Sequence, residues 1–213
     1  MIRAASAWPQ PWSALVLTAR LAVPLCAAVV LAAVAFNFLK AREAGPAERV
    51  TRSPVATGTM LLFFGAAWAL IRFRVGEVAI ASGPIAAASA VAGALGVIAG
   101  AAVNVAGRLA LGANWADQVT VYRAQTLVTS GIFGYVRHPL YASLIWMFCG
   151  AAFAYHNWAA LAATLAVFVP AMHYRAGQEE RVLEERFPGY GAYRAAVPRF
   201  LPRTWKRWRH DRV

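Results

Sequence analysis

Long uncharged apolar runs alternate with short charged segments along most of this chain. The first three runs are residues 21–39, 55–71 and 85–107, the last beginning after Gly83-Pro84 interrupts a longer uncharged stretch. A helix of about 20 apolar residues is needed to cross the hydrocarbon core of a bilayer. The pattern therefore predicts three membrane-spanning helices within residues 1–117. We expect the first run to be retained as a helix, because the region before it is too long and too rich in Trp and Pro for a signal peptide.

A fourth uncharged stretch extends from His138 to Tyr174. It is too long for one crossing at about 1.5 Å per residue, but it suits two crossings if the chain reverses at His156-Asn157. We therefore expect a helical hairpin over residues 138–174. The predicted fold class is an all-α integral membrane protein with about five transmembrane helices and a C-terminal helical tail. In this division residues 118–213 form the functional core, with residues 175–213 as a cap.

Composition and charge support a membrane protein and orient it. Hydrophobic residues make up 60% of the chain and charged residues 14%, against about half and about a quarter in soluble domains. The net charge of +12 is high enough for nucleic acid, but the charges lie between apolar runs, so we expect no nucleic-acid partner. With the N-terminus outside, 17 of the 21 Lys and Arg residues fall on one side of the membrane. The excess of positive charge on cytoplasmic loops then predicts a cytoplasmic C-terminal tail.

Two smaller features of the apolar runs concern packing. Cys26 and Cys149 form no Cys-x-x-Cys pair, so we expect buried thiols and no metal site. Small or amide side chains recur at helical spacing in the third run, at Gly93, Gly96, Gly100, Asn104 and Gly107. Such a stripe lets helices approach closely. It favours packing within the molecule and leaves a homodimer possible.

Residues whose side chains could take part in binding or catalysis are concentrated after residue 117. Pro139 suits the first turn of a helix, whose unpaired amides can face an anionic group, and His138 before it is a ligand, an acid–base group or a polar cap. Arg175 and Glu179 stand four residues apart on a predicted helix, where an exposed ion pair is the ordinary interpretation. Arg175, however, lies where the last crossing leaves the bilayer, and ionisable residues there are costly unless used. We expect an apolar set to fold the tail back over this region: Phe187, Tyr190, Tyr193, Val197 and Leu201.

Residues 126–202 resemble the isoprenylcysteine carboxyl methyltransferase family, within the wider group that includes membrane phospholipid N-methyltransferases. The matching pieces, in order, are Thr126-Leu127-Val128-Thr129-Ser130-Gly131, Arg137-His138-Pro139-Leu140-Tyr141, Glu179-Glu180-x-x-Leu183 with Phe187, Tyr190 and Tyr193, and Val197-x-Arg199-x-x-Pro202. Each fragment alone is weak, and it is their order and spacing together that carry the resemblance.

The resemblance implies a cytoplasm-facing pocket for S-adenosylmethionine and access for the acceptor from the lipid side. By position, the implied cofactor contacts are Gln118, Gln125, Thr126, Leu127, Val128, Phe133, His138, Pro139, Leu140, Tyr141 and Glu179. Arg175 falls where the family places an acceptor-binding arginine, so Arg175 and Glu179 are the expected catalytic pair. Phe133 replaces a usual tyrosine, and Gln125 a commoner histidine. Pro188-Gly189 replaces the usual glycine after the phenylalanine.

We therefore expect a methyltransferase dependent on S-adenosylmethionine that acts on a lipidic or prenylated small molecule among membrane lipids. Carboxylate O-methylation of an isoprenylcysteine-like acceptor is the leading hypothesis, since Arg175 suits an anion. Phospholipid N-methylation and small-thiol S-methylation are alternatives within the same class. From other classes, a non-catalytic membrane scaffold or a fold-related membrane reductase stays open.

Overall fold

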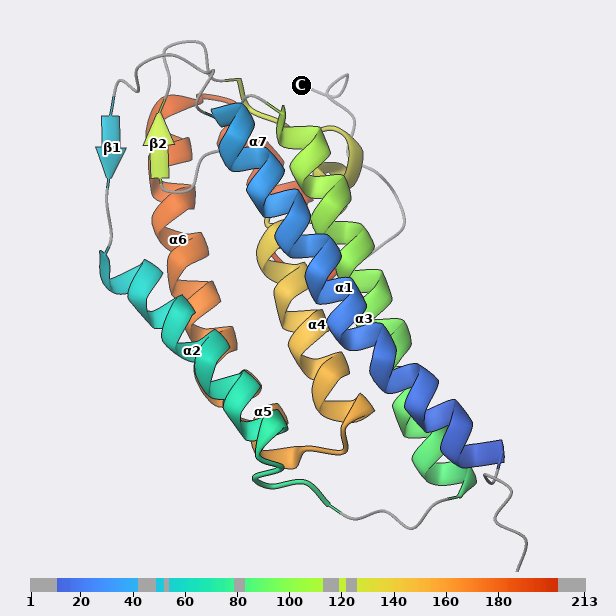
Figure 1. The fold of residues 1–213 in the computed structure, drawn as a ribbon. Helices are drawn as coiled ribbons and strands as arrows, with labels where there is room; N and C mark the ends of the chain where they lie inside the picture. The colour runs from blue at the N-terminus through green and yellow to red at the C-terminus, as the bar shows by residue number, and fades with distance from the viewer. Residues whose placement is uncertain are drawn as a thin grey trace, which may run out of the picture.

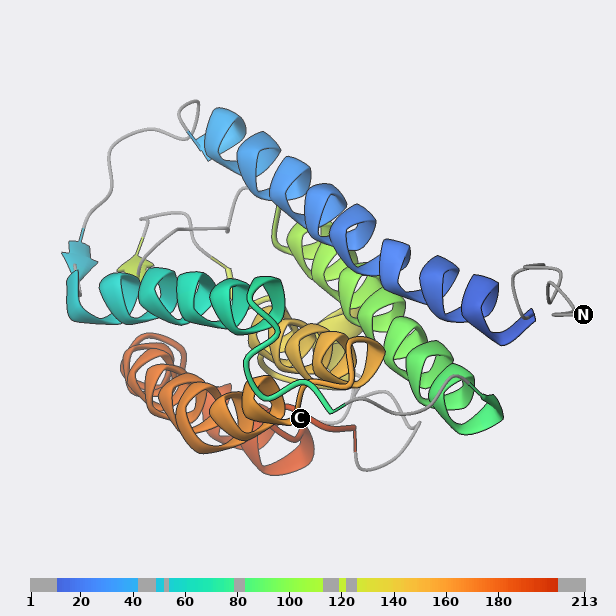
Figure 2. The ribbon, with the colours of Figure 1, turned by 60° about the horizontal axis from the view of Figure 1, so that its bottom comes forward.

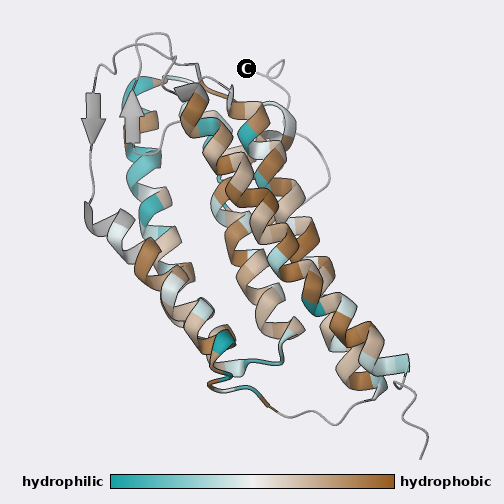
Figure 3. Ribbon diagram, in the orientation of Figure 1, coloured by the Kyte–Doolittle hydropathy of each residue, from teal (hydrophilic) through white to brown (hydrophobic). Residues whose placement is uncertain are grey.

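The structure is a computed structural model that describes residues 11–41, 49–51, 54–78, 83–112, 119–121 and 126–202. Its helices form one slanted bundle (Figure 1). Within the described residues, the helices long and apolar enough to cross a membrane are Pro11–Leu39, Pro84–Leu111 and Trp158–Arg186, and shorter apolar helices are Met60–Arg72 and Pro139–Ala154. Hydrophobic residues line most of the bundle, whereas hydrophilic residues concentrate on one end of α6 (Figure 3). The all-α fold of an integral membrane protein is supported, and the count of five spans stays a prediction.

The elements follow in a simple order along the chain. The helices are α1 (Pro11–Ala41), α2 (Pro54–Arg72), α3 (Pro84–Leu111), α4 (Pro139–Ala154), α5 (Trp158–Ala163), α6 (Val169–Arg186) and α7 (Tyr190–Ala196). A short antiparallel ribbon of β1 (Arg49–Thr51) and β2 (Val119–Val121) lies at one end of the bundle (Figure 1). A 3-10 turn, η2 (Gly131–Gly134), precedes α4, and a π-helical turn, η3 (Thr164–Phe168), joins α5 to α6. The π turn lies just before Pro170, whose missing N–H and bulky ring disturb regular helical bonding.

The first helix extends beyond the predicted span on its N-terminal side. The helix begins at Pro11, whereas the predicted span begins after Arg20. Arg20 is tolerated inside α1 because its Nε donates to the carbonyl of Ala154 at 3.0 Å and its Nη2 lies 3.5 Å from Glu77 Oε1. Where the span begins within this helix stays a prediction.

Close packing of α3 on α4 forms the centre of the bundle. A Cβ atom added at Gly93 would collide with the backbone of Gly150, and one added at Gly100 would lie 2.7 Å from the carbonyl oxygen of Ser143. The glycine stripe therefore serves contacts within the molecule, while the homodimer stays an untested prediction. Asn104 of the same stripe is fully buried and donates to Ser143 Oγ at 2.7 Å. Figure 2 shows α1 lying along the outside of α3.

The chain reverses between α4 and α5 at the predicted place. His156 has a φ of +52°, a left-handed conformation that turns the backbone. Asn157 then caps α5, since its Oδ1 accepts from the backbone N–H of Ala160 at 2.8 Å. Its Nδ2 also donates to the carbonyl of Leu70 at 3.1 Å, which ties the turn to the end of α2. The helical hairpin expected over 138–174 is thus present. The predicted boundary at 117/118 lies outside the described residues.

Candidate active site

The predicted site residues meet where the start of α4, the hydrophilic end of α6 and the segment after α7 converge. Pro139 is the first residue of α4, which suits a residue without a backbone N–H. His138 directly precedes the helix, and its carbonyl accepts from the N–H of Ala142 at 3.0 Å. On α6, Arg175, Glu179 and Glu180 lie within two turns of one another. One helix start and one helix end therefore supply most of the polar groups.

Glu180 is the buried centre of an ionic cluster. Its side chain is 3% exposed, and its Oε1 accepts from Arg137 Nη2 at 3.0 Å and from Arg199 Nε at 3.0 Å. Arg199 Nη2 reaches the other oxygen at 2.5 Å, and His138 Nε2 lies 3.0 Å from Oε1. A buried charge is tolerated only when it is paired and hydrogen-bonded in this way. The geometry makes Glu180 the anchor that joins three separate segments.

The chain after α7 is fixed against the loop before α4 by its backbone as well. The N–H of Arg137 donates to the carbonyl of Pro198 at 2.9 Å, and the N–H of His138 donates to the carbonyl of Arg199 at 3.1 Å. The Arg137 guanidinium also donates to the carbonyls of Arg194 and Val197. Residues 197–199 thus act as a strap across the start of α4.

Glu179, next to Glu180 in sequence, has a different environment. Its side chain is 27% exposed, its Oε1 accepts a hydrogen bond from the Tyr141 hydroxyl, and its Oε2 lies 3.4 Å from His138 Nδ1. The Tyr141 hydroxyl also accepts from Arg175 Nε at 2.9 Å. The rings of His138 and Tyr141 stack with centroids 5.7 Å apart and an interplanar angle of 11°. Tyr141 therefore joins Arg175 and Glu179 through a single hydroxyl.

His138 is held between two carboxylates. Burial alone would lower the pKa of its imidazole, but hydrogen bonds and charges from Glu179 and Glu180 outweigh burial and raise the pKa above the ordinary value. As an imidazolium, His138 donates from Nδ1 toward Glu179 and from Nε2 toward Glu180. The arrangement favours a charged, orienting His138 over a histidine that accepts protons.

The tail packs over the site through an apolar cap. Its buried residues are Tyr190, Tyr193 and Val197, and packed against them are Leu127, Leu183 and Phe187. The Tyr193 hydroxyl donates to the carbonyl of Phe133 at 2.7 Å, which ties α7 to the 3-10 turn. The predicted folding back of the tail is confirmed for these residues. It is wrong for Leu201, which is 66% exposed.

The structure brings some of the predicted contacts together and separates others. His138, Tyr141, Arg175 and Glu179 form one connected group. Among the other predicted cofactor contacts, Leu127 and Phe133 adjoin the cap, Thr126 is exposed and Val128 half-buried, and Pro139 and Leu140 lie near Gly107 of α3. Gln118 and Gln125 lie outside the described residues.

Four residues at the site have no role in the sequence prediction: Arg137, Glu180, Arg199 and Met60. Arg175 Nη1 donates to the Met60 Sδ at 3.4 Å, which brings α2 into the site. The first three belong to the motifs that carry the family resemblance. An ion pair between the two arginines of those motifs and their second glutamate could therefore have been predicted from the sequence. Nothing in the sequence points to Met60.

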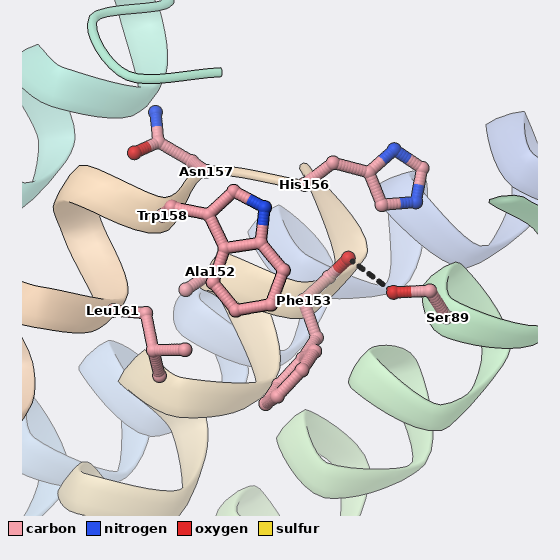
Figure 4. A pocket seen from close by; sticks show the side chains of 7 residues that line it. All are labelled: Ser89, Ala152, Phe153, His156, Asn157, Trp158 and Leu161. Atoms are coloured by element: carbon pink, nitrogen blue, oxygen red, sulfur yellow. Dashed lines mark hydrogen bonds between the residues drawn. The ribbon is translucent and has the colours of Figure 1, made fainter. Parts of the chain in front are cut away.

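A small pocket lies at the other end of α4, away from this group (Figure 4). Its lining residues are Ser89, Ala152, Phe153, His156, Asn157, Trp158 and Leu161. The Ser89 hydroxyl donates across it to the carbonyl of Phe153 at 3.3 Å. None of the predicted site residues borders this pocket. In the part of the chain that the structure describes, no group of three His, Cys, Asp or Glu side chains is placed to hold a metal ion.

Comparison with protein families identifies the central part of the chain. Residues 92–185 match the sequence model of the Isoprenylcysteine carboxyl methyltransferase (ICMT) family. The predicted resemblance to this family is confirmed over these residues. The ICMT match runs from within α3 almost to the end of α6, so it contains the group around Tyr141 and leaves out α1, α2 and the strap. It supports a membrane methyltransferase. No curated protein matches the chain significantly.

Proposed function

We propose that this protein transfers a methyl group from S-adenosylmethionine to the carboxylate of a lipidic acceptor of the isoprenylcysteine type. The observation that carries the proposal is the joining of Arg175 and Glu179 on the Tyr141 hydroxyl, within the stretch that matches the ICMT family. An arginine suited to an anion and a partly exposed carboxylate suited to a cation then lie side by side. The reaction needs these two binding functions next to each other.

The residues present fit the cofactor. Glu179 offers a partly exposed carboxylate to an ammonium or sulfonium group, and Tyr141 offers an aromatic face for a cation. The Tyr190 hydroxyl, 1% exposed in the cap, has no hydrogen-bond partner within the described residues. A buried hydroxyl without a partner is costly, and a polar group of a bound molecule would satisfy it. Glu179, Tyr141, His138 and the cap would therefore hold the cofactor.

The protein's part in the reaction is binding and alignment. When bound, S-adenosylmethionine supplies an electrophilic methyl carbon, whose bond to the acceptor oxygen forms as its bond to sulfur breaks and the electron pair stays on sulfur. Arg175 binds and orients the acceptor carboxylate through charge-assisted hydrogen bonds. The carboxylate arrives already ionised, so no side chain removes a proton. Correct alignment of the two reactants then accounts for much of the acceleration.

The geometry favours an anionic acceptor over an amine or a thiol. Those acceptors lose a proton during methylation and need a general base. Both ring nitrogens of His138 face carboxylates, which raise its pKa above the ordinary value, and Glu179 already accepts a hydrogen bond from the Tyr141 hydroxyl. Phospholipid N-methylation and thiol S-methylation are therefore second candidates.

The test measures cofactor binding and methyl transfer separately, on protein purified in detergent. We expect Glu179→Gln to weaken S-adenosylmethionine binding in calorimetry by at least tenfold, because it removes the charge that pairs with the cofactor. The exposed Glu185→Gln is the matched control and leaves affinity unchanged. Arg175→Ala keeps the affinity but loses transfer of a radiolabelled methyl group to a prenylcysteine carboxylate. Equal loss of both functions in Arg175→Ala would contradict the assigned roles, and a wild-type protein that binds no cofactor would point to a scaffold.

A further inference from the structure

The apolar surface that the bundle exposes is taller on α3 than on α6. On α3 the exposed residues from Ile85 to Leu109 are alanine, isoleucine or leucine, and these two ends lie about 36 Å apart at about 1.5 Å per residue. On the continuous helix of α5 and α6, exposed apolar side chains extend from Trp158 only to Tyr174, about 24 Å along the helix. The hydrocarbon core of a bilayer is about 30 Å thick, so the α3 surface is taller than the core and the α6 surface is shorter.

The two apolar surfaces are level at the end of the bundle away from the candidate site. His156 Nε2 lies 3.1 Å from the carbonyl of Ala86, and Ile85 is the residue next to Ala86. Trp158 follows His156 by two residues. The difference in height between α3 and α6 therefore arises at the other end, where the candidate site lies.

Contacts with the start of α4 show which parts of α3 and α6 share a level at the candidate site. A Cβ atom added at Gly107 of α3 would lie 3.4 Å from Pro139 Cγ. His138, the residue before Pro139, has its Nε2 3.0 Å from Glu180 Oε1 of α6. Gly107 and Glu180 therefore mark one level of the bundle.

At that level the two sides of the bundle present opposite surfaces. Leu109 lies two residues beyond Gly107 and is 70% exposed, whereas Arg181 is exposed directly after Glu180, on the hydrophilic end of α6 (Figure 3). Leucine favours hydrocarbon and arginine is costly in it, so a flat membrane surface does not suit both. A rigid tilt of the protein does not suit them either, because it would shift both ends of α6 along the membrane normal, and only one end differs.

We propose that the bilayer thins against α6 on the side of the candidate site, so that its head-group layer descends to the level of Arg175 while it stays higher along α3. A bilayer adapts to a short apolar surface by thinning next to it. Arg175 directly follows Tyr174, which is 68% exposed and ends the apolar surface of α6. The consequence for the acceptor rests on the proposed function: a lipidic molecule brings its carboxylate to Arg175 within the head-group layer and keeps its chain in the hydrocarbon.

The first experiment measures the depth of spin labels in vesicles of dioleoyl phosphatidylcholine, from their relaxation by dissolved oxygen and by a water-soluble nickel chelate. The labels are attached to single cysteines, in a background with Cys26→Ala and Cys149→Ala, by the variants Leu109→Cys, Arg181→Cys, Ile85→Cys and Trp158→Cys. We expect the label at 109 to lie in the hydrocarbon and the label at 181 at head-group level. The labels at 85 and 158 lie at equal depth.

The same four labels can overturn the proposal in two ways. Equal depths at 109 and 181 would show a flat membrane surface. A label at 85 in water together with a label at 158 in hydrocarbon would show a rigid tilt. Elution as a single species and a wild-type midpoint of unfolding by denaturant show that each variant is folded. These depths require no methyl transfer, so they can be read even if the proposed function fails.

The second experiment tests the consequence for the acceptor, using wild-type protein in vesicles of dimyristoleoyl, dioleoyl and dierucoyl phosphatidylcholine. We expect the KM for N-acetyl-S-farnesylcysteine, expressed per lipid, to rise at least about fivefold from the thinnest to the thickest bilayer, because the cost of thinning grows with each ångström of mismatch. The affinity for S-adenosylmethionine in calorimetry changes less than about twofold, since the cofactor comes from water.

A pair of variants on α6 separates bilayer thickness from other effects of the lipid. Arg181→Leu raises the apolar edge of α6, and we expect it to raise the KM in dioleoyl vesicles about twofold to fivefold. Arg186→Leu, more than one turn further along the helix, is the matched control and leaves the KM unchanged. A KM that does not depend on bilayer thickness would overturn the role of thinning in acceptor binding. A wild type that methylates no carboxylate refutes the proposed function instead, and the label depths then decide whether the bilayer thins.

Discussion

Two clusters of charged side chains lie at the two ends of α4, and the protein uses their hydrogen-bonding capacity differently. At the far end, the cluster of Arg20, Glu77 and His156 joins α1 to two turns. Arg20 Nη2 lies 3.5 Å from Glu77 Oε1 and 3.4 Å from His156 Nδ1, and its Nε donates to the carbonyl of Ala154. His156 Nε2 lies 3.1 Å from the carbonyl of Ala86. Strong donors face strong acceptors throughout this cluster.

The cluster at the start of α4 contains the same kinds of residue, but it divides into two parts. Glu180 is fully used by Arg137, Arg199 and His138. Glu179 is 27% exposed, and Arg175 rests partly on a thioether. This difference between the two clusters shows that charge and burial alone do not identify a side chain that binds a ligand. Partial exposure distinguishes Glu179, which we assign to a ligand, from the buried Glu180, which holds the fold.

Of the variants that test this comparison, the one that removes the charge of Glu180 should lower the stability of the protein most. We expect Glu180→Gln to lower the free energy of unfolding by about 3–5 kcal/mol, because two arginines and an imidazolium lose their buried counter-charge. Unfolding by denaturant in detergent measures this loss of free energy. Glu185→Gln, exposed on the same helix, changes stability by less than about 0.5 kcal/mol. Similar stability of Glu180→Gln and Glu179→Gln would contradict the division between the two neighbours.

Breaking the far cluster should have a moderate effect on stability and none on chemistry. We expect Arg20→Met to lower the free energy of unfolding by about 1–2 kcal/mol, since Glu77 keeps Arg74 as a partner through the hydrogen bond of 2.5 Å between Arg74 Nε and Glu77 Oε2. Binding of S-adenosylmethionine and the KM for the acceptor remain those of the wild type. A selective loss of cofactor affinity in Arg20→Met would show that the far cluster also serves the site.

The smallest expected effect is a pH dependence from His138. Because its pKa is raised in the folded protein, it contributes stability that is complete below the pKa of the unfolded chain and is lost as pH rises through the folded pKa. Each unit of the rise corresponds to about 1.4 kcal/mol. We expect His138→Asn to be less stable than the wild type at pH 6 and to approach it above the folded pKa. A difference that stays constant between pH 6 and pH 9 would contradict the raised pKa of His138.

Features set by local sequence pattern could be predicted well. An interruption of the apolar run by His156-Asn157 marks the reversal of the hairpin, because polar residues and a turn coincide there. The stripe that includes Gly93 and Gly100 predicts close helix packing from spacing alone, and Ser143 and Gly150 of α4 lie against it. The motifs between Thr126 and Leu183, which lie within the matched residues, were enough to indicate the resemblance to the family.

Features set by distant partners could not be predicted. Glu179 and Glu180 are neighbours on one helix, and the sequence does not show which of them turns inward until Arg137 and Arg199 are placed around it. The partners of Arg20 inside α1 could not be predicted for the same reason, since Glu77 and Ala154 come from distant parts of the chain. Met60 enters the site through three-dimensional packing alone.

The strap of residues 197–199 has a consequence for the order in which the protein is made. All of the helices α1 to α7 precede it in the chain, so a ribosome releases the whole bundle before it releases the strap. Until then the N–H groups of Arg137 and His138 lack their carbonyl partners, and Glu180 lacks Arg199. A nascent chain that has delivered its apolar helices to the membrane therefore still has an unfinished candidate site. Synthesis that stops before Arg199 would leave the helices inserted but the site without these contacts, and the site would be complete only after residues 197–199 are added.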